Sequence, residues 1–219
     1  MQNTDRIRSW FILTSMPISI GCLVLAMLKF NGWQSAAWWS YGFAALYIFY
    51  AIIFKDKLMG RFLLFTMVAG FTELIADYWL VHYTHSLFYP QDEPMLSASP
   101  AYMPFSWTVV LMQIGYLGFL ISKKYKLLFT SFSVGLIGCI IIPFYEYLAI
   151  NAGWWHYENV PSWGLVPIYI FLAEGILMVS IPNLFDRCEK ISLKWIPVLG
   201  IIQGLVMWIA CIIAFYLVG

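Results

Sequence analysis

Long apolar runs, each bounded by polar or charged residues, make up most of this 219-residue chain. A helix of about 20 apolar residues crosses the hydrocarbon core of a bilayer, and seven runs approach or exceed this length. Lipid offers backbone groups no partners, and the runs are too long and evenly apolar for barrel strands, so each predicts a helix. The predicted spans are Trp10–Leu28, Trp38–Phe54, Phe62–Val81, Phe105–Ile121, Leu127–Gly153, Val166–Leu184 and Trp195–Val218. The sequence therefore predicts an all-α, polytopic membrane bundle of seven transmembrane helices, with residues 1–219 forming a single integral membrane domain.

Composition agrees with this interpretation and excludes several classes of partner. The chain is 62% hydrophobic and 11% charged, whereas soluble domains are about 45–50% apolar and about 25% charged. The net charge of +1 and the lack of a glycine-rich phosphate loop argue against nucleic acid and nucleotides. We expect the partners to be the lipid bilayer and a lipid or other apolar small molecule, and the oligomeric state stays open.

The basic residues predict how the bundle is oriented. Eleven of the 12 lysines and arginines fall before the first span or in alternate connections, and Lys29 alone falls on the other side. Short cytoplasmic loops carry the excess of lysine and arginine. We therefore expect a cytoplasmic amino terminus and an outer carboxyl terminus.

Two stretches of the sequence resemble each other. The segments 71–83 and 144–158 share the order Phe-x-Glu, then alanine, then His-Tyr, with one residue inserted in the second. The matched residues are Glu73, Ala76, His82 and Tyr83 against Glu146, Ala149, His156 and Tyr157. The match indicates a tandem two-helix repeat, spans three-four and five-six, and chance similarity is the alternative.

Four carboxylates lie inside the predicted spans: Glu73, Asp77, Glu146 and Glu174. A charged group at mid-membrane costs about 2.5–3.5 kcal/mol, so such residues face the bundle interior. No lysine or arginine occurs in the central part of a span, and burial without a counter-charge favours the neutral carboxyl. A protonated carboxyl can donate a proton, so we predict that the four acids converge in the outer half as a catalytic group. The alternative is that they only tie helices together by hydrogen bonds.

Aromatic and polar residues near the outer ends of the spans are candidates for contacts with the substrate. They are Trp79, His82, Gln113, Tyr147, Asn151, Trp154, Trp155 and His156. An interfacial aromatic belt is the alternative interpretation of the tryptophans. The acids and histidines are suitable metal ligands, but the sequence lacks an H-E-x-x-H motif, so we predict neither a metal nor another cofactor.

The segment AGWWHYENVPSWGLVPIYIFLAE, residues 152–174, resembles part of the bacterial and archaeal lycopene cyclase domains and the related carotenoid hydratases. The residues that carry the resemblance are Gly153, Trp155, Tyr157, Gly164, Pro167 and Glu174. Membrane terpene cyclases are similar in size and in their intramembrane acids. The lycopene cyclase domains place two acids almost directly after the proline, whereas Glu174 is the first acid after Pro167 here. The resemblance therefore implies acid-initiated chemistry on a polyprenyl or other lipid alkene, in a bacterial or archaeal cytoplasmic membrane.

The functional prediction is an integral membrane enzyme that cyclises, hydrates or isomerises an isoprenoid or similar lipid within the bundle. A small-solute or proton-coupled transporter would use the same acids, and would need a water path that reaches both faces. A membrane sensor or assembly protein is the third alternative, with outer aromatic loops that dock a partner. An enzyme predicts a pocket that is closed on the cytoplasmic side.

Overall fold

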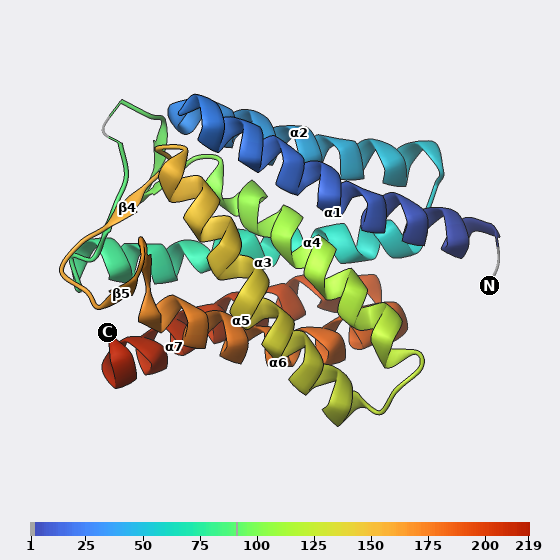
Figure 1. The fold of residues 1–219 in the computed structure, drawn as a ribbon. Coiled ribbons are helices and arrows are strands. Elements are labelled where there is room, and N and C mark those ends of the chain that lie inside the picture. The colour runs from blue at the N-terminus through green and yellow to red at the C-terminus, as the bar shows by residue number, and fades with distance from the viewer. Residues whose placement is uncertain (1–2, 91) are drawn as a thin grey trace.

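The computed structural model describes residues 3–90 and 92–219, and over these ranges it contains seven helices long and apolar enough to cross a membrane. The helices are α1 (Asn3–Lys29), α2 (Gly32–Ile53), α3 (Lys57–His82), α4 (Met103–Ser122), α5 (Leu127–Asn151), α6 (Ile168–Lys190) and α7 (Ile196–Val218), with a short 3-10 turn η1 (Leu193–Trp195). Figure 1 shows the two ends of the chain at opposite ends of the bundle. The predicted all-α, multi-pass membrane bundle is confirmed.

The helix boundaries differ from the predicted spans in ways that have physical causes. α1 and α6 continue into polar residues beyond the apolar runs, because a helix keeps its backbone hydrogen bonds after it leaves the apolar layer. α5 ends at Asn151 and not at Gly153, whose backbone is left-handed with φ +76°. α6 begins at Ile168 because the preceding Val166 and Pro167 form a strand.

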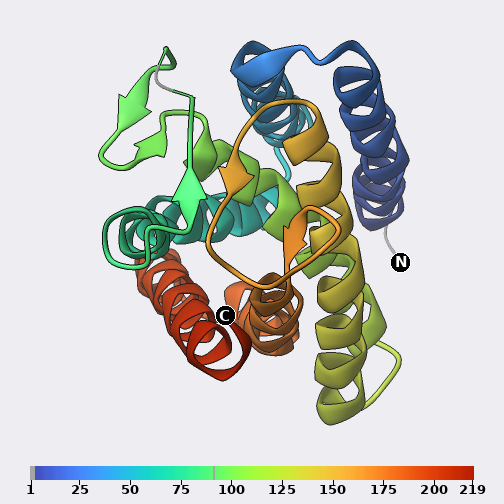
Figure 2. The ribbon, with the colours of Figure 1, turned by 60° about the vertical axis from the view of Figure 1, so that its left-hand side comes forward.

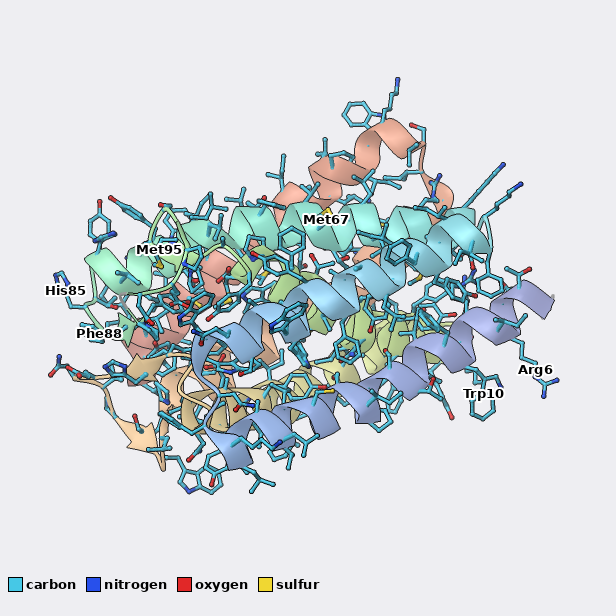
Figure 3. The ribbon with its side chains drawn as sticks, turned by 90° about the horizontal axis from the view of Figure 1, so that it is seen from above. Arg6, Trp10, Met67, His85, Phe88 and Met95 are labelled. Carbon is cyan, nitrogen blue, oxygen red and sulfur yellow. The ribbon has the colours of Figure 1, made fainter. Side chains whose placement is uncertain are left out.

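In the part of the chain that the structure describes, six strands of two residues each lie in the connections α3–α4 and α5–α6, and the sequence prediction missed them. They are β1 (Leu87–Phe88), β2 (Met95–Leu96), β3 (Ser99–Pro100), β4 (His156–Tyr157), β5 (Ser162–Trp163) and β6 (Val166–Pro167). β2–β3 and β5–β6 are antiparallel hairpins, and β1 pairs antiparallel with β4 from the other connection. We call the end of the bundle that carries these strands the strand end, and the opposite end, with the connections α2–α3, α4–α5 and α6–α7, the basic end. Figure 3 shows Arg6 and Trp10 toward the basic end, and His85, Phe88 and Met95 toward the strand end.

The units α3–α4 and α5–α6 share one architecture. Each consists of a helix, a strand that pairs with the other unit, a hairpin and a returning helix. The hairpin turns contain left-handed residues at equivalent places, Ser97 with φ +63° and Gly164 with φ +66°. The N–H groups of Ala101 and Ile168 each donate to the carbonyl of a proline seven residues earlier, at 2.8 and 2.9 Å. The two units therefore have similar structures, and the pairing of β1 with β4 joins them.

α4 lies toward the middle of the bundle, and α1 and α2 pack along one side of it (Figure 2). α4 contacts α1, α2, α3, α5 and α6, so it is the most enclosed helix. α5 and α6 approach closely at Gly138, where a Cβ atom would lie 2.8 Å from the Glu174 carbonyl oxygen. Small residues allow such close helix packing in membranes. The contact fixes the backbone of α6 at one of the four buried acids.

Candidate functional site

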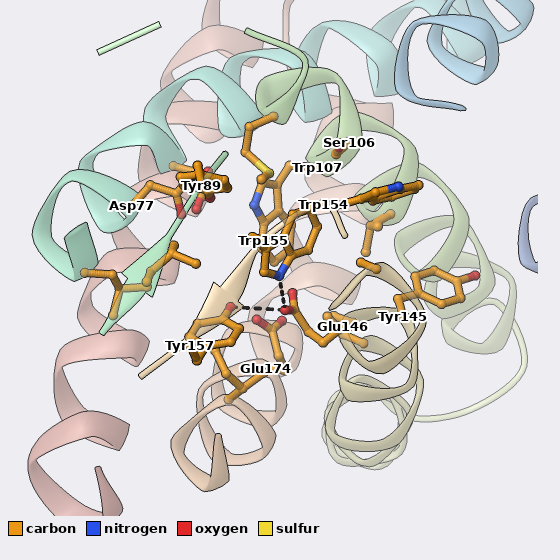
Figure 4. A pocket seen from close by; sticks show the side chains of 18 of the residues that line it. Asp77, Tyr89, Ser106, Trp107, Tyr145, Glu146, Trp154, Trp155, Tyr157 and Glu174 are labelled. Carbon is orange, nitrogen blue, oxygen red and sulfur yellow. Dashed lines mark hydrogen bonds between the residues drawn. The ribbon is translucent and has the colours of Figure 1, made fainter. Parts of the chain in front are cut away.

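A pocket of about 70 Å³ lies in the strand-end half of the bundle, and all seven helices contribute to its lining. The four acids predicted from the sequence, Glu73, Asp77, Glu146 and Glu174, all line it. They come from α3, α5 and α6, and Figure 4 shows Asp77, Glu146 and Glu174 around the same space. The structure thus brings together the carboxylates that the sequence expected to converge.

The rest of the lining is aromatic and apolar. Trp39, Trp107, Trp154 and Trp155 contribute indole rings from α2, α4 and the loop after α5. Among the described residues that line the pocket, none is lysine, arginine or histidine. The carboxylates therefore face ring surfaces and hydroxyls with no cation beside them.

Glu146 is held by the loop that follows its own helix. The indole Nε1 of Trp155 donates to Glu146 Oε2 at 2.8 Å, and the Tyr157 hydroxyl donates to the same oxygen at 3.0 Å (Figure 4). The left-handed turn at Gly153 ends α5 and sends the chain back over the helix end. Burial, followed by the neighbouring charge of Glu146, raises the pKa of Tyr157, so its hydroxyl stays protonated and donates.

Asp77 has the matching arrangement in the other unit. The Tyr89 hydroxyl donates to Asp77 Oδ2 at 2.7 Å. Burial and then the charge of Asp77 raise the pKa of Tyr89, which keeps this donor protonated as well. By these tyrosine bonds Asp77, not Glu73, corresponds to Glu146. The sequence match paired Glu73 with Glu146 and was one helical turn out of register.

The remaining two acids have oxygens without partners. Among the described residues, nothing bonds Glu73 Oε2 or Glu174 Oε2, and each side chain is buried, with only 3% of its surface exposed. A buried polar atom without a partner costs about 1–3 kcal/mol. Glu73 and Glu174 are therefore the acids best placed to bind and react with a ligand.

Two of the predicted substrate contacts, Trp154 and Trp155, line the pocket, and the others lie outside its lining. Tyr147 follows Glu146 in the helix, so its side chain points about 100° away, and it is 45% exposed on the outside of the bundle. Asn151 donates to the carbonyl of Tyr147 at 2.7 Å on that same face. Neither Tyr147 nor Asn151 lines this pocket, and their contact with a substrate stays a prediction.

The histidines and Trp79 also lie outside the pocket lining. His156 precedes Tyr157 in β4, and successive strand residues point to opposite sides, so Tyr157 faces the acids while His156 is exposed against Phe88. His82 is exposed as well, and its ring packs on that of Tyr78, one turn earlier in α3. Trp79 packs edge-on against Phe215 of α7. None of the three lines the pocket, and their contact with a substrate stays a prediction.

Gln113 lies one side chain behind the pocket wall. It is fully buried; Tyr145 donates to its Oε1 at 3.3 Å, and its Nε2 donates to the Tyr47 hydroxyl at 3.1 Å. The Tyr145 ring lines the pocket, while its hydroxyl points away from the acids (Figure 4). Gln113 therefore holds the Tyr145 hydroxyl and does not line the pocket itself, and its contact with a substrate stays a prediction.

Several pocket residues escaped the sequence prediction. Tyr89 lies in an irregular loop where no helical spacing links it to Asp77, although a tyrosine before a proline at the end of an acid-bearing helix is a usable signal. Trp39 and Trp107 lie near the outer ends of their predicted spans, where an interfacial aromatic belt explains tryptophans equally well. Among the described residues, no group of three or more histidines, cysteines and acids is arranged to hold a metal ion.

Comparison with known proteins gives a family and no activity. A family profile described as a domain of unknown function, DUF6989, matches residues 74–218. This range covers the last nine residues of α3 and the chain from there to Val218; it includes Asp77, Glu146 and Glu174 and begins one residue after Glu73. No curated protein and no solved structure matches the chain. Because the profile matches well over half of its length, the chain belongs to the DUF6989 family.

Proposed function

We propose that the protein is an integral membrane enzyme that cyclises, hydrates or isomerises an isoprenoid or similar lipid alkene by acid–base chemistry. One observation carries the proposal: four carboxylates share an aromatic-lined pocket inside the bundle, in which no described residue supplies a cation. The likeness of residues 152–174 to lycopene cyclase domains and carotenoid hydratases supports the same class of substrate.

The environments of the acids suggest how the roles divide. Glu146 and Asp77 accept hydrogen bonds from tyrosine hydroxyls, and such bonds favour the ionised carboxylate. Glu73 is buried with an unpartnered oxygen, and burial alone favours the neutral acid. Glu73 is therefore the proposed proton donor, and the ionised Asp77 and Glu146 stabilise positive charge nearby.

The reaction begins when the O–H bond of the Glu73 carboxyl breaks and its proton forms a C–H bond with one alkene carbon. The alkene π electrons make that bond, which leaves a carbocation on the other carbon and a carboxylate on Glu73. Cyclisation or isomerisation ends when a C–H bond beside the cation breaks and one of the ionised carboxylates, Asp77 or Glu146, takes the proton. Hydration ends instead when water adds its oxygen to the cation and loses a proton to the same carboxylates.

The pocket walls suit such an intermediate. The indole faces of Trp39, Trp107, Trp154 and Trp155 attract a cation by up to about 2 kcal/mol each when water is excluded. Enclosure by seven helices keeps bulk water from quenching the cation early. We also propose the orientation and location that the sequence suggests: a cytoplasmic amino terminus in a bacterial or archaeal cytoplasmic membrane, with the pocket in the outer half.

The proposal is tested by the origin of a new carbon-bound hydrogen. Membranes that contain the protein are incubated in D2O with linear polyprenyl alkenes, and the lipid extract is analysed by mass spectrometry. We expect a product with one solvent-derived deuterium on carbon, lost in Glu73→Gln and kept in Asp92→Asn, a matched exposed acid at the same end. If Glu73→Gln forms the product as fast as the wild type, the assigned chemistry is wrong.

A proton-coupled carrier is the second candidate, and one observation favours it. Polar side chains continue from the pocket wall through Tyr145, Gln113 and Tyr47 to Ser15, whose Oγ lies 2.6 Å from the Tyr47 hydroxyl. A carrier requires such groups between the two faces. Purified protein in liposomes loaded with a pH dye would then show solute-dependent proton flux, which Gln113→Leu would abolish and which an enzyme would not produce.

A further inference from the structure

We propose that a groove between α1 and α2, open to the surrounding lipid, holds the apolar tail of the substrate while its reacting end enters the acid pocket past Trp39. The inference rests on the proposed function, because it assigns a second part of the binding site to the same lipid. Its occupant is a single-chain neutral lipid with a hydroxyl-sized polar head. Nothing in the resemblance or the family assignment points to this face of the protein.

The groove has a definite place in the bundle. It has a volume of about 550 Å³ and runs along α1 and α2 between Ile18 and Leu46 near mid-helix and Asn31 at the strand end. Ile18, Leu25 and Leu46 are exposed on it. Both helices cross the apolar layer, so the medium that meets these side chains is lipid chains.

Size requires a second compartment. A water-sized group needs roughly 10–15 Å³ of such volume, so a pocket of 70 Å³ holds about five groups of that size. A polyprenyl chain has many more heavy atoms than this. The acid pocket therefore accepts only the reacting end, and the remainder of the chain needs an adjoining apolar space, which the larger groove provides.

Trp39 connects the two spaces, since it lines both the groove and the acid pocket. Its indole Nε1 donates to the carbonyl of Ser19 at 3.2 Å, and its ring centroid lies 6.1 Å from that of Trp154. Trp154 in turn donates from Nε1 to the Ser35 hydroxyl at 2.8 Å, and Ser35 lines the groove. Two indoles, each held by one hydrogen bond, thus form the partition.

The polarity of the groove selects the kind of lipid. Asn31 and Ser35 lie at its strand end, and apolar residues such as Phe43 and Leu46 lie further in. Its described lining contains no acid, lysine, arginine or histidine. A charged headgroup would have no counter-charge there, whereas a hydroxyl has two hydrogen-bonding side chains. The geometry therefore fits a neutral polyprenyl alcohol or a similar lipid, with its head at Asn31.

The test uses a photoreactive diazirine analogue of geranylgeraniol in phosphatidylcholine vesicles that contain the full-length protein. After illumination, labelled peptides are mapped by mass spectrometry. We expect labelling on the α1 and α2 segments that line the groove, and Trp39→Ala should extend it to peptides of α5 and α6. Labelling spread evenly over all lipid-facing helices would overturn the proposal.

Glycines provide matched variants. A Cβ atom at Gly42, in the groove, meets no atom within 4 Å, so larger side chains fill the groove without a clash. The series Gly42→Ala, Gly42→Leu and Gly42→Phe should reduce groove labelling in graded steps, to about a tenth in the last. Gly60→Phe, at an equally open glycine near the basic end, should leave labelling unchanged.

The two proposals fail separately in this experiment. Glu73→Gln should lose turnover and keep groove labelling, because it changes the chemistry and not the tail site. Turnover that requires Glu73 but survives Gly42→Phe with labelling intact would refute the groove and leave the enzyme. Groove labelling blocked by Gly42→Phe, together with full turnover in Glu73→Gln, would refute the chemistry and leave the lipid site.

Discussion

Carboxylates are buried at both ends of the bundle, in opposite settings. At the basic end, Asp56 accepts hydrogen bonds from Arg8 Nη1 at 2.8 and 2.7 Å, and both side chains are almost completely buried. Asp56 also caps the start of α3 by accepting from the N–H groups of Leu58 and Met59, and Arg8 bonds to the Tyr116 hydroxyl. At the strand end, the buried Asp77 and the part-buried Glu146 accept only from hydroxyl or indole donors among the described residues, and Oε2 of the buried Glu73 and Glu174 has no partner there.

The difference separates a structural site from a reactive one. A buried carboxylate whose two oxygens accept from one arginine nitrogen, and which also accepts from two backbone N–H groups, is fixed in one charge state and one position. It ties α1 to α3, and protonation of Asp56 would break this ion pair and leave Arg8, among the described residues, with only the carboxylate of Asp5, whose Oδ1 lies 2.6 Å from Arg8 Nη2. An acid with no counter-charge can instead exchange its proton at lower cost, since neither state leaves a partner stranded. The proposed acid–base chemistry therefore fits the strand end, and the ion pair gives rigidity to the basic end.

The largest expected effect is on turnover. Glu73→Gln keeps the shape of the side chain and removes the acidic proton, so the rate should fall by about 10²–10⁴-fold, the usual contribution of a general acid. The free energy of unfolding should change by less than about 1 kcal/mol, because no hydrogen bond to Glu73 Oε2 is lost. Product formation and denaturant titration in detergent measure the two quantities. If Glu73→Gln lowers the free energy of unfolding but leaves turnover normal, Glu73 has a structural role like that of Asp56.

The next effect is on stability at the basic end. Arg8→Met leaves Asp56 buried without its cation, which should lower the free energy of unfolding by about 3–5 kcal/mol. Arg6→Met is the matched control, because Arg6 is exposed on the same helix, and it should stay within about 0.5 kcal/mol.

A double variant sharpens this test. Arg8→Met with Asp56→Asn removes the stranded charge and should recover part of the lost stability in the same titration. Equal unfolding free energies for Arg6→Met and Arg8→Met would show that the ion pair is not what holds α1 to α3.

A smaller effect distinguishes the two tyrosine–acid pairs. Tyr89→Phe removes the hydroxyl that donates to Asp77, whereas Tyr157→Phe leaves Glu146 with the Trp155 donor. A hydrogen bond to a charged group is worth about 1.5–3 kcal/mol, so Tyr89→Phe should slow turnover by about tenfold or more, and Tyr157→Phe by only a few-fold. Equal losses in steady-state rate would mean that the indole does not substitute for the hydroxyl.

The sequence was informative wherever a large energy acts on a single element. Apolar length fixed the seven helices, and the cost of a charge in lipid was enough to direct Glu73, Asp77, Glu146 and Glu174 inward. Contacts between separate helices could not be predicted in this way. Nothing in the sequence shows that Arg8 meets Asp56, 48 residues away, because an acid in a connection normally faces water.

Details of the strand end were beyond the sequence for a related reason. Strands of two residues carry no readable alternation, so His156 was chosen as a contact where its neighbour Tyr157 faces the pocket. The repeat was found, but its register came from neighbouring aromatic residues and not from the tyrosine bonds that hold Asp77 and Glu146. Such bonds depend on where loops fold back, which local sequence leaves open.

The smallest effect concerns Glu93, a buried acid in the connection between α3 and α4, outside the membrane-spanning helices. No described residue bonds either of its carboxylate oxygens, and burial raises its pKa to about 7. Burial, followed by the charge of the neighbouring Glu93, raises the pKa of the Tyr102 phenol. The folded protein binds the Glu93 proton more tightly than the unfolded chain does. Its stabilisation is therefore complete below the ordinary pKa near 4.5 and is lost as the pH rises through about 7.

Amide hydrogen exchange of residues 92–102, corrected for intrinsic exchange, should show this loss as a few-fold drop in protection between pH 5 and pH 8. Water near the rim of the bundle screens the charge, which keeps the effect below that of the Arg8–Asp56 pair. Glu93→Gln should hold protection constant across this range, and Asp92→Asn, at the exposed neighbour, should follow the wild type. A wild-type loop equally protected at both pH values would mean that Glu93 is satisfied in its charged form. It would then belong with Asp56 among the acids that the fold has fixed.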